Sequence, residues 1–265
     1  MIYSNPSIHG VTVTTLKKIG FPYGDNLLMT YLGGSHAHGA KIEGSADTDW
    51  FGVFVEPAAK LMGLDAYEHF VHTTGGKDGG NGPDDVDICF YSLRKWAKLA
   101  AQGNPSSLQF MFAAPHYKHP LWDYIKWKRE AFLSRGHVRP FLGFADDQMK
   151  RLFGEKGQKN CHRKESEEKF GYDTKYAMHV IRLYGEAKEL MEKGWITYPR
   201  PNAAQLIDIR LGKYTLSQIR DMGRTLEAEA ISAMEKSSLP PAINREAVSE
   251  IIAEVYQAFW KGGDL

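Results

Sequence analysis

Hydrophobic and polar positions in the first part of the chain are grouped into short runs that predict β-strands. Apolar and aromatic residues concentrate at 27–33, 49–55 and 86–91, and glycine, proline or acidic residues flank these runs. Runs of this length and composition are typical of strands rather than helices. Between the second and third runs the pattern is mixed, and residues 72–85 contain so many glycine and aspartate residues that we expect a mobile loop there.

Helical spacing dominates the rest of the chain. Ser92 stands where an N-cap would precede a helix, and Gly103, Asn104 and Pro105 would end that helix. From about residue 106 onward the apolar spacing is helical nearly throughout, including 173–193 and 217–236, with a polar, lysine-rich connection at 154–169. The pattern therefore predicts an α+β protein, with a small mixed-sheet domain over residues 1–115 and a helical domain over residues 116–265.

Composition removes several classes of protein without choosing a function. The chain has 265 residues, of which 43% are hydrophobic and 25% charged, so disordered, collagen-like and disulfide-scaffold proteins are excluded. Two cysteines, Cys89 and Cys161, are too few for a four-thiolate zinc site and are typical of a reducing compartment. We see neither a secretory signal nor an apolar run long enough to cross a bilayer, so we expect a cytoplasmic protein without a membrane partner.

Charge is unevenly distributed although the net charge is only +1. Acidic residues outnumber basic ones in the first 100 residues, and the balance reverses afterwards, with a local excess of lysine and arginine at 117–139. Such an excess can bind phosphate, but on composition alone a solvated helix surface is the simpler explanation. The tyrosine and tryptophan residues of the same segment are typical of single-strand nucleic-acid binders, and also of a helix packed into a core.

Three carboxylates carry the clearest chemical signal. Asp47 and Asp49 stand two residues apart at the start of a predicted strand, so their side chains would project to the same side. Asp87 begins the later strand between apolar neighbours, where an isolated carboxylate is unfavourable. If the two strands pair, the three residues form the ligand set for two Mg²⁺ ions that support phosphoryl transfer, with Mn²⁺ as a substitute. Asp47 and Asp49 alone would also fit a loop that caps itself.

A glycine turn precedes these carboxylates. Gly33 and Gly34 allow the backbone to approach a ligand closely, and N–H groups in such turns bind phosphate oxygens. His36 and His38 follow, and their spacing also permits a zinc interpretation. Because oxygen ligands favour Mg²⁺ and no third histidine or cysteine lies at ligand spacing, we favour contacts with nucleotide phosphate or a role in shaping the turn.

In combination these elements resemble the DNA polymerase β-like nucleotidyltransferase superfamily, whose signature is Gly-Ser, Asp-x-Asp and a third acidic residue on a later strand. The match is closer to the RNA-repair-pathway (RlaP-like) nucleotidyltransferases. The matching elements are 34–39, 46–53, Asp87 with Tyr91, Arg94, Lys95 and Trp96, then 103–105, 170–183 and 206–215. The resemblance covers roughly residues 28–225. Two departures are Ala46, where serine is common, and the glycine-rich loop at 75–82.

The resemblance implies a polymerase β palm-like domain and a metal-dependent nucleotidyltransferase. It implies that the enzyme transfers a nucleoside monophosphate from an NTP such as ATP to an acceptor hydroxyl and releases pyrophosphate. An RNA end, in RNA repair, is the acceptor that the resemblance suggests. Asp47, Asp49 and Asp87 would be the catalytic and metal-binding residues. Gly34 and Ser35 would hold the triphosphate. A small molecule or a protein as acceptor, and a non-catalytic nucleotide or RNA sensor on the same fold, stay open as alternatives.

One further stripe of residues is assigned by the resemblance. Lys175, His179 and Arg182 follow one another at i, i+4 and i+7 on the helix predicted over 173–193. The resemblance implies that this stripe faces the nucleotide cleft, with Lys175 and Arg182 on triphosphate oxygens and His179 in a hydrogen bond. A solvated helix edge is the alternative. Arg94 and Lys95 could balance the acidic site, and Asn104 could cap the chain reversal that follows.

Overall fold

The computed structural model describes residues 13–42, 47–75, 85–154 and 164–262. Its strands are β1 (Leu27–Leu32), β2 (Thr48–Phe54), β3 (His69–Thr73), β4 (Val86–Ser92) and β5 (Tyr117–Lys118). The helices before β5 are α1 (Val13–Lys18), η1 (Gly24–Asn26), α2 (Gly34–His38), α3 (Ala58–Met62), α4 (Leu93–Ala101) and α5 (Pro105–Phe112). Those after it are α6 (Pro120–Trp127), η2 (Arg129–Phe132), η3 (Arg135–His137), α7 (Val138–Leu152), α8 (Lys164–Phe170), α9 (Thr174–Lys193), α10 (Ala203–Arg210), α11 (Leu216–Lys236) and α12 (Arg245–Lys261).

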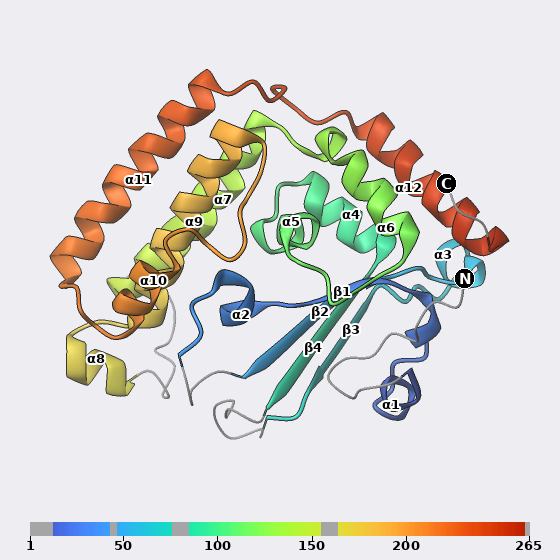
Figure 1. Cartoon of the computed structure of the whole chain (residues 1–265), viewed down its shortest axis with the longest axis horizontal. Helices are drawn as coiled ribbons and strands as arrows, with labels where there is room; N and C mark the ends of the chain where they lie inside the picture. The colour runs from blue at the N-terminus through green and yellow to red at the C-terminus, as the bar shows by residue number, and fades with distance from the viewer. Residues whose placement is uncertain (1–12, 43–46, 76–84, 155–163, 263–265) are drawn as a thin grey trace.

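The strands form one mixed sheet in the order β3-β4-β2-β1-β5. β2 and β4 run parallel, whereas the other neighbouring pairs are antiparallel. In Figure 1 helices α4, α5 and α6 lie above the sheet, α1 lies below it, and the helices from α7 to α11 stand beside it. The expected α+β class, with a mixed sheet followed by helices, is therefore confirmed.

Both faces of the sheet are packed, because its strands alternate buried side chains between two cores. On the α1 side, Phe21 packs against Phe54 and Phe90 at ring-centroid distances of 5.2 and 5.1 Å. On the opposite side, a larger core continues from the sheet into the helices and contains Trp96 and Trp122, whose rings lie 4.8 Å apart. Because this core contains buried residues from both predicted segments, the domain boundary after residue 115 stays a prediction.

Local capping explains where the principal helices begin. The Ser92 side chain accepts a hydrogen bond from the backbone N–H of Lys95, which confirms the expected N-cap of α4. Asn104 caps α5 by accepting from the backbone N–H of Ser107. Asp173 does the same at α9, where its carboxylate accepts the N–H groups of Lys175 and Tyr176 at 2.8 and 3.1 Å. These caps fix the start of each helix relative to the strand or turn before it.

The structure contains short elements that the sequence pattern does not predict. The glycine turn after β1 contains the five-residue helix α2, and the mixed stretch after β2 contains α3 and the edge strand β3. A two-residue strand, β5, interrupts the predicted helical region. Most of the glycine-rich loop and of the polar connection, residues 76–84 and 155–163, lies outside the described residues. Within the described part of the chain, every helix is too short or too polar to cross a membrane.

Candidate active site

Asp47, Asp49 and Asp87 converge at one end of the sheet. Strands β2 and β4 pair in parallel with Asp49 directly beside Asp87, and the Thr48 N–H donates to the Asp85 carbonyl at 2.9 Å where both strands begin. One carboxylate oxygen from each of the three aspartates lies within 4.8 Å of the others. The sequence-based expectation that these side chains meet is thus confirmed. Their role in catalysis stays a prediction.

The convergence has an electrostatic consequence. Burial, followed by the negative charges of Asp47 and Asp87, raises the pKa of Asp49 from 3.8 to about 6, and Lys175 lowers it in part. Like charges held this close favour protonation unless a cation lies between them. The donors are all hard carboxylate oxygens, which is the ligand chemistry that Mg²⁺ and Mn²⁺ prefer. The three residues therefore fit a divalent-metal site.

The glycine turn lies directly against this acidic site. The Gly33 N–H donates to the Asp49 carbonyl at 2.8 Å. Gly34 has a φ of +51°, and a Cβ placed there would lie only 1.9 Å from Asp49 Oδ2. Glycine is therefore required at position 34 both by its backbone conformation and by the carboxylate. The turn continues into α2, which places Ser35 one residue from this contact.

The two histidines of α2 have different surroundings. His36 is partly buried, and its Nε2 lies 3.1 Å from Lys41 Nζ. His38 is 5% exposed, and its Nδ1 lies 3.6 Å from a carboxylate oxygen of Glu186. Burial, with a smaller contribution from the positive charge of Arg182, holds the pKa of His38 well below its ordinary value, so the ring is neutral. Neither histidine belongs to a metal-binding cluster among the described residues, so the zinc interpretation gains no support.

The stripe on α9 extends from the acidic site toward the interior. Lys175 is exposed and is near enough to Asp49 to affect its pKa. Further along, an Arg182 Nη2 lies 3.4 Å from His179 Nδ1, and Arg182 Nη1 donates to both oxygens of Glu186 at 3.0 and 2.9 Å. Arg182 is thus engaged with the protein itself, so its expected contact with a triphosphate stays a prediction. Glu186, which the sequence analysis missed, continues the stripe by one more helical turn.

Comparison with known proteins places this arrangement in a family. Residues 8–247 match the model of the RNA repair pathway DNA polymerase beta family, RlaP. The chain belongs to the RlaP family. The match includes the glycine turn, the three carboxylates and the α9 stripe.

Two individual proteins are similar to this RlaP-family chain. An uncharacterized 38.9 kDa protein in the nrdC-mobD intergenic region of Enterobacteria phage T4 is 30% identical over 131 residues, which are 48% of this chain and 38% of the phage protein. The chain thus matches less than half of that relative. A crystal structure of a nucleotidyltransferase-like protein from Exiguobacterium sibiricum 255-15 is 9% identical, covering 91% of this chain and 73% of that one, with a TM-score of 0.30. A TM-score this low supports no inference about the fold.

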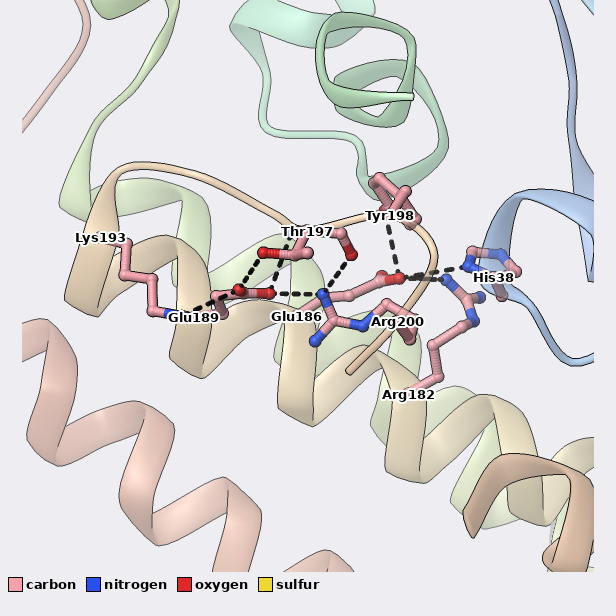
Figure 2. Close-up of polar contacts among 8 residues, drawn as sticks. All are labelled: His38, Arg182, Glu186, Glu189, Lys193, Thr197, Tyr198 and Arg200. Carbon is pink, nitrogen blue, oxygen red and sulfur yellow. Dashed lines mark hydrogen bonds and ion pairs between the residues drawn. The ribbon is translucent and has the colours of Figure 1, made fainter. Parts of the chain in front are cut away.

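Behind the RlaP-family stripe lies a buried polar network (Figure 2). Glu186 is fully buried and also accepts a hydrogen bond from Tyr198 Oη at 3.1 Å. One turn further, Glu189 accepts from the Thr197 N–H and hydroxyl and from Arg200 Nη1. Burial alone would raise the pKa of Glu189, but hydrogen bonds from Thr197 and Arg200 lower it to about 2. Two carboxylates of α9 therefore hold the 197–200 segment.

The remaining residues noted in the sequence are held mainly by protein contacts. Arg94 pairs with Glu68 at 3.1 Å, and Lys95 lies 4.0 Å from the same carboxylate. In the aromatic segment Trp122 is fully buried, whereas Trp127 is 70% exposed with Lys128 Nζ 4.4 Å from its ring. Core packing thus accounts for Trp122 and for the partly buried Tyr117 and Tyr124. Trp127 with Lys128 keeps the exposed ring and the cation on which the nucleic-acid interpretation depends.

Proposed function

We propose that this RlaP-family chain is a metal-dependent nucleotidyltransferase that transfers a nucleoside monophosphate from an NTP, such as ATP, to an acceptor hydroxyl. The observation that supports this most directly is the convergence of Asp47, Asp49 and Asp87 beside a glycine turn. Three mutually repelling carboxylates are unfavourable unless they bind cations, and membership of a polymerase beta family makes divalent-metal chemistry the simplest purpose.

Each residue would contribute to a simple displacement. The acceptor oxygen forms a bond to the α-phosphorus as the bond to the bridging oxygen breaks, and pyrophosphate leaves. In the proposal Asp47 and Asp49 would hold both Mg²⁺ ions, while Asp87 would complete the site and would orient the acceptor hydroxyl or accept its proton. The bound ions would supply charge neutralisation for the phosphates, and Mn²⁺ could replace them. This chemistry depends on positioning and charge, so each carboxylate should be essential.

The nucleotide would lie between α2 and α9. Gly34 and Ser35 would hold the triphosphate with His36, and Lys175, His179 and Arg182 would approach it from α9. The electrostatic effect of Lys175 on Asp49 supports this arrangement, because Lys175 belongs to the first turn of α9 and must therefore lie near the acidic site. Residues 116–265 would then form the helical domain that completes the cleft. Since His38 is buried against Glu186, we expect it to support the turn rather than to contact phosphate.

An RNA end is our preferred acceptor. The family description refers to RNA repair, and Trp127 with Lys128 offers an exposed ring beside a cation. Nucleic-acid binding weakens steeply with added salt, because phosphate contacts release counterions, whereas small-molecule binding usually does not. A steep salt dependence of the acceptor KM would support RNA, and a flat one would favour a small molecule.

Label transfer tests the proposal. Purified protein is incubated with each α-labelled NTP, Mg²⁺ or Mn²⁺, and separate pools of short RNA, DNA, protein and metabolites, and pyrophosphate release is measured. We expect label on RNA with the wild type and at least a thousandfold less with Asp49→Asn or Asp87→Asn. Asp208→Asn is a matched control, because the Asp208 side chain lies at the surface and pairs with Lys213 at 2.7 Å. NTP binding without transfer to any pool would favour the non-catalytic sensor, and full activity in both site variants would refute the metal mechanism.

A further inference from the structure

Glu186 occupies the buried end of the α9 stripe and is the one carboxylate there with no solvent exposure. Both carboxylate oxygens accept hydrogen bonds from Arg182 Nη1, and one of them also accepts from the Tyr198 hydroxyl (Figure 2). Nδ1 of the His38 ring lies 3.6 Å from the carboxylate. A buried carboxylate is tolerated only when such partners surround it, and a buried ion pair is weak evidence of a stabilising role.

One consequence concerns Arg182. The hydrogen bonds from Nη1 to Glu186 fix its guanidinium, and Nη2 is then directed toward His179. His179 is the stripe residue between Arg182 and Lys175, and Lys175 lies near Asp49. Arg182 is only 13% exposed on its side chain, so few other orientations are open to it. A guanidinium held in this way is preorganised, and it loses little further freedom when it donates to a phosphate oxygen.

A second consequence concerns α2. Residues 197–200, which Glu186 and Glu189 hold, lie against the end of α2. There the backbone N–H of Arg200 donates a hydrogen bond to the carbonyl of His38 at 3.1 Å. At Gly39, which has a φ of +69°, an added Cβ would lie 2.9 Å from Pro199 Cβ, so the two backbones are in close contact there. The other end of α2 is Gly34, which touches the Asp49 carboxylate. Contacts therefore continue from Glu186 through Tyr198 and His38 to the acidic site.

We propose that Glu186 is a positioning residue: it orients Arg182 toward the phosphates of the nucleotide and fixes α2 against Asp49. This inference rests on the proposed function, because it assigns Glu186 to the nucleotide side of the same site. It acts through Arg182 and α2, and it does not itself contact the substrate.

The substitution Glu186→Gln separates positioning from two simpler roles, because it keeps the shape of the side chain and removes its charge. If Glu186 only neutralised Arg182, the freed positive charge would attract the triphosphate and lower the KM for NTP. If Glu186 were only structural, the variant would unfold at a lower temperature with an unchanged KM. Positioning predicts a KM for NTP about tenfold higher with kcat changed less than threefold, the effect of roughly one misplaced charge-assisted hydrogen bond.

The experiment measures KM and kcat for NTP well below the unfolding temperature, together with Mn²⁺ affinity. Glu229→Gln is the matched control, since Glu229 only pairs with Lys188 at the surface at 2.9 Å and should leave both constants unchanged. Tyr198→Phe removes one hydrogen bond from Glu186 and should raise KM by about threefold, which keeps the proposal testable if Glu186→Gln does not fold. A KM that falls or stays constant in the folded variants of Glu186 and Tyr198 overturns the proposal. Wild-type protein that neither binds NTP nor transfers label refutes the proposed function as well.

Discussion

Replacing Asp49 by asparagine should stabilise the metal-free protein while it destroys the site. Burial and the two neighbouring carboxylates raise the pKa of Asp49 from 3.8 to about 6. A carboxyl group with a raised pKa in the folded state destabilises the fold whenever it is ionised, so the effect is complete above about pH 6 and absent below about pH 4. Asparagine has nearly the same shape without the charge, and should remove the destabilisation.

The magnitude follows from the size of the shift. About two pKa units correspond to about 3 kcal/mol. Asp49 is only partly buried, and solvent screens its charge, so we expect about 1–2 kcal/mol. For a chain of this length that increase raises the unfolding temperature by about 3–6 °C.

The assay is thermal unfolding of wild type, Asp49→Asn and the control Asp208→Asn in a chelator at pH 8 and at pH 4. The variant should unfold at a higher temperature than wild type at pH 8, and the difference should disappear at pH 4. Adding Mn²⁺ at pH 8 should stabilise wild type only, because ligand binding to the folded state adds stability. A folded Asp49→Asn variant no more stable than wild type at pH 8 would refute the argument that burial and the two neighbouring carboxylates destabilise the ionised Asp49.

Two other substitutions test the surroundings of the site. Gly34→Ala should destabilise the protein by about 1–3 kcal/mol, because residue 34 has a positive φ. It should also abolish Mn²⁺ binding, because the new Cβ would lie 1.9 Å from Asp49 Oδ2. Calorimetric titration with Mn²⁺ measures this affinity, and a normal affinity would contradict the geometry. Ser92→Ala removes the N-cap of α4 and should lower the free energy of unfolding, measured in urea, by about 1 kcal/mol. The KM for NTP should not change. An altered KM with normal stability would argue against a purely structural cap.

The sheet core and the acidic site could be predicted because their signals are local. Three apolar runs match β1, β2 and β4, and an aspartate between apolar residues is conspicuous in any strand. Strand β3 was missed because it is an edge strand whose outward residues are exposed, Val71 at 62%, so its pattern is not that of a buried run. Helix α2 was missed because it has only five residues, begins at the second of two glycines and carries no periodicity.

The buried network was beyond reach for a different reason. Glu186 continues the spacing of Lys175, His179 and Arg182, so extending the stripe by four residues would have found it. Its partners Tyr198 and Arg200 lie on a segment without periodic structure, and only the packing of that segment against α9 and α2 brings them together. Long-range contacts of this kind leave no signal in one sequence. The roles assigned to the nucleotide-binding residues stay predictions.

The parallel pairing of β2 and β4 determines where this chain can change in length without loss of the acidic site. A one-residue slip between these strands would turn Asp87 to the opposite face, so neither strand tolerates an insertion. The connection between them contains β3, which pairs with β4 and sets Thr73 beside Asp87, so among its described residues only the exposed stretch between α3 and β3 lies outside the register. Relatives could therefore gain or lose residues within the exposed stretch 63–66 without moving the carboxylates, which makes this stretch the natural place to insert a reporter peptide.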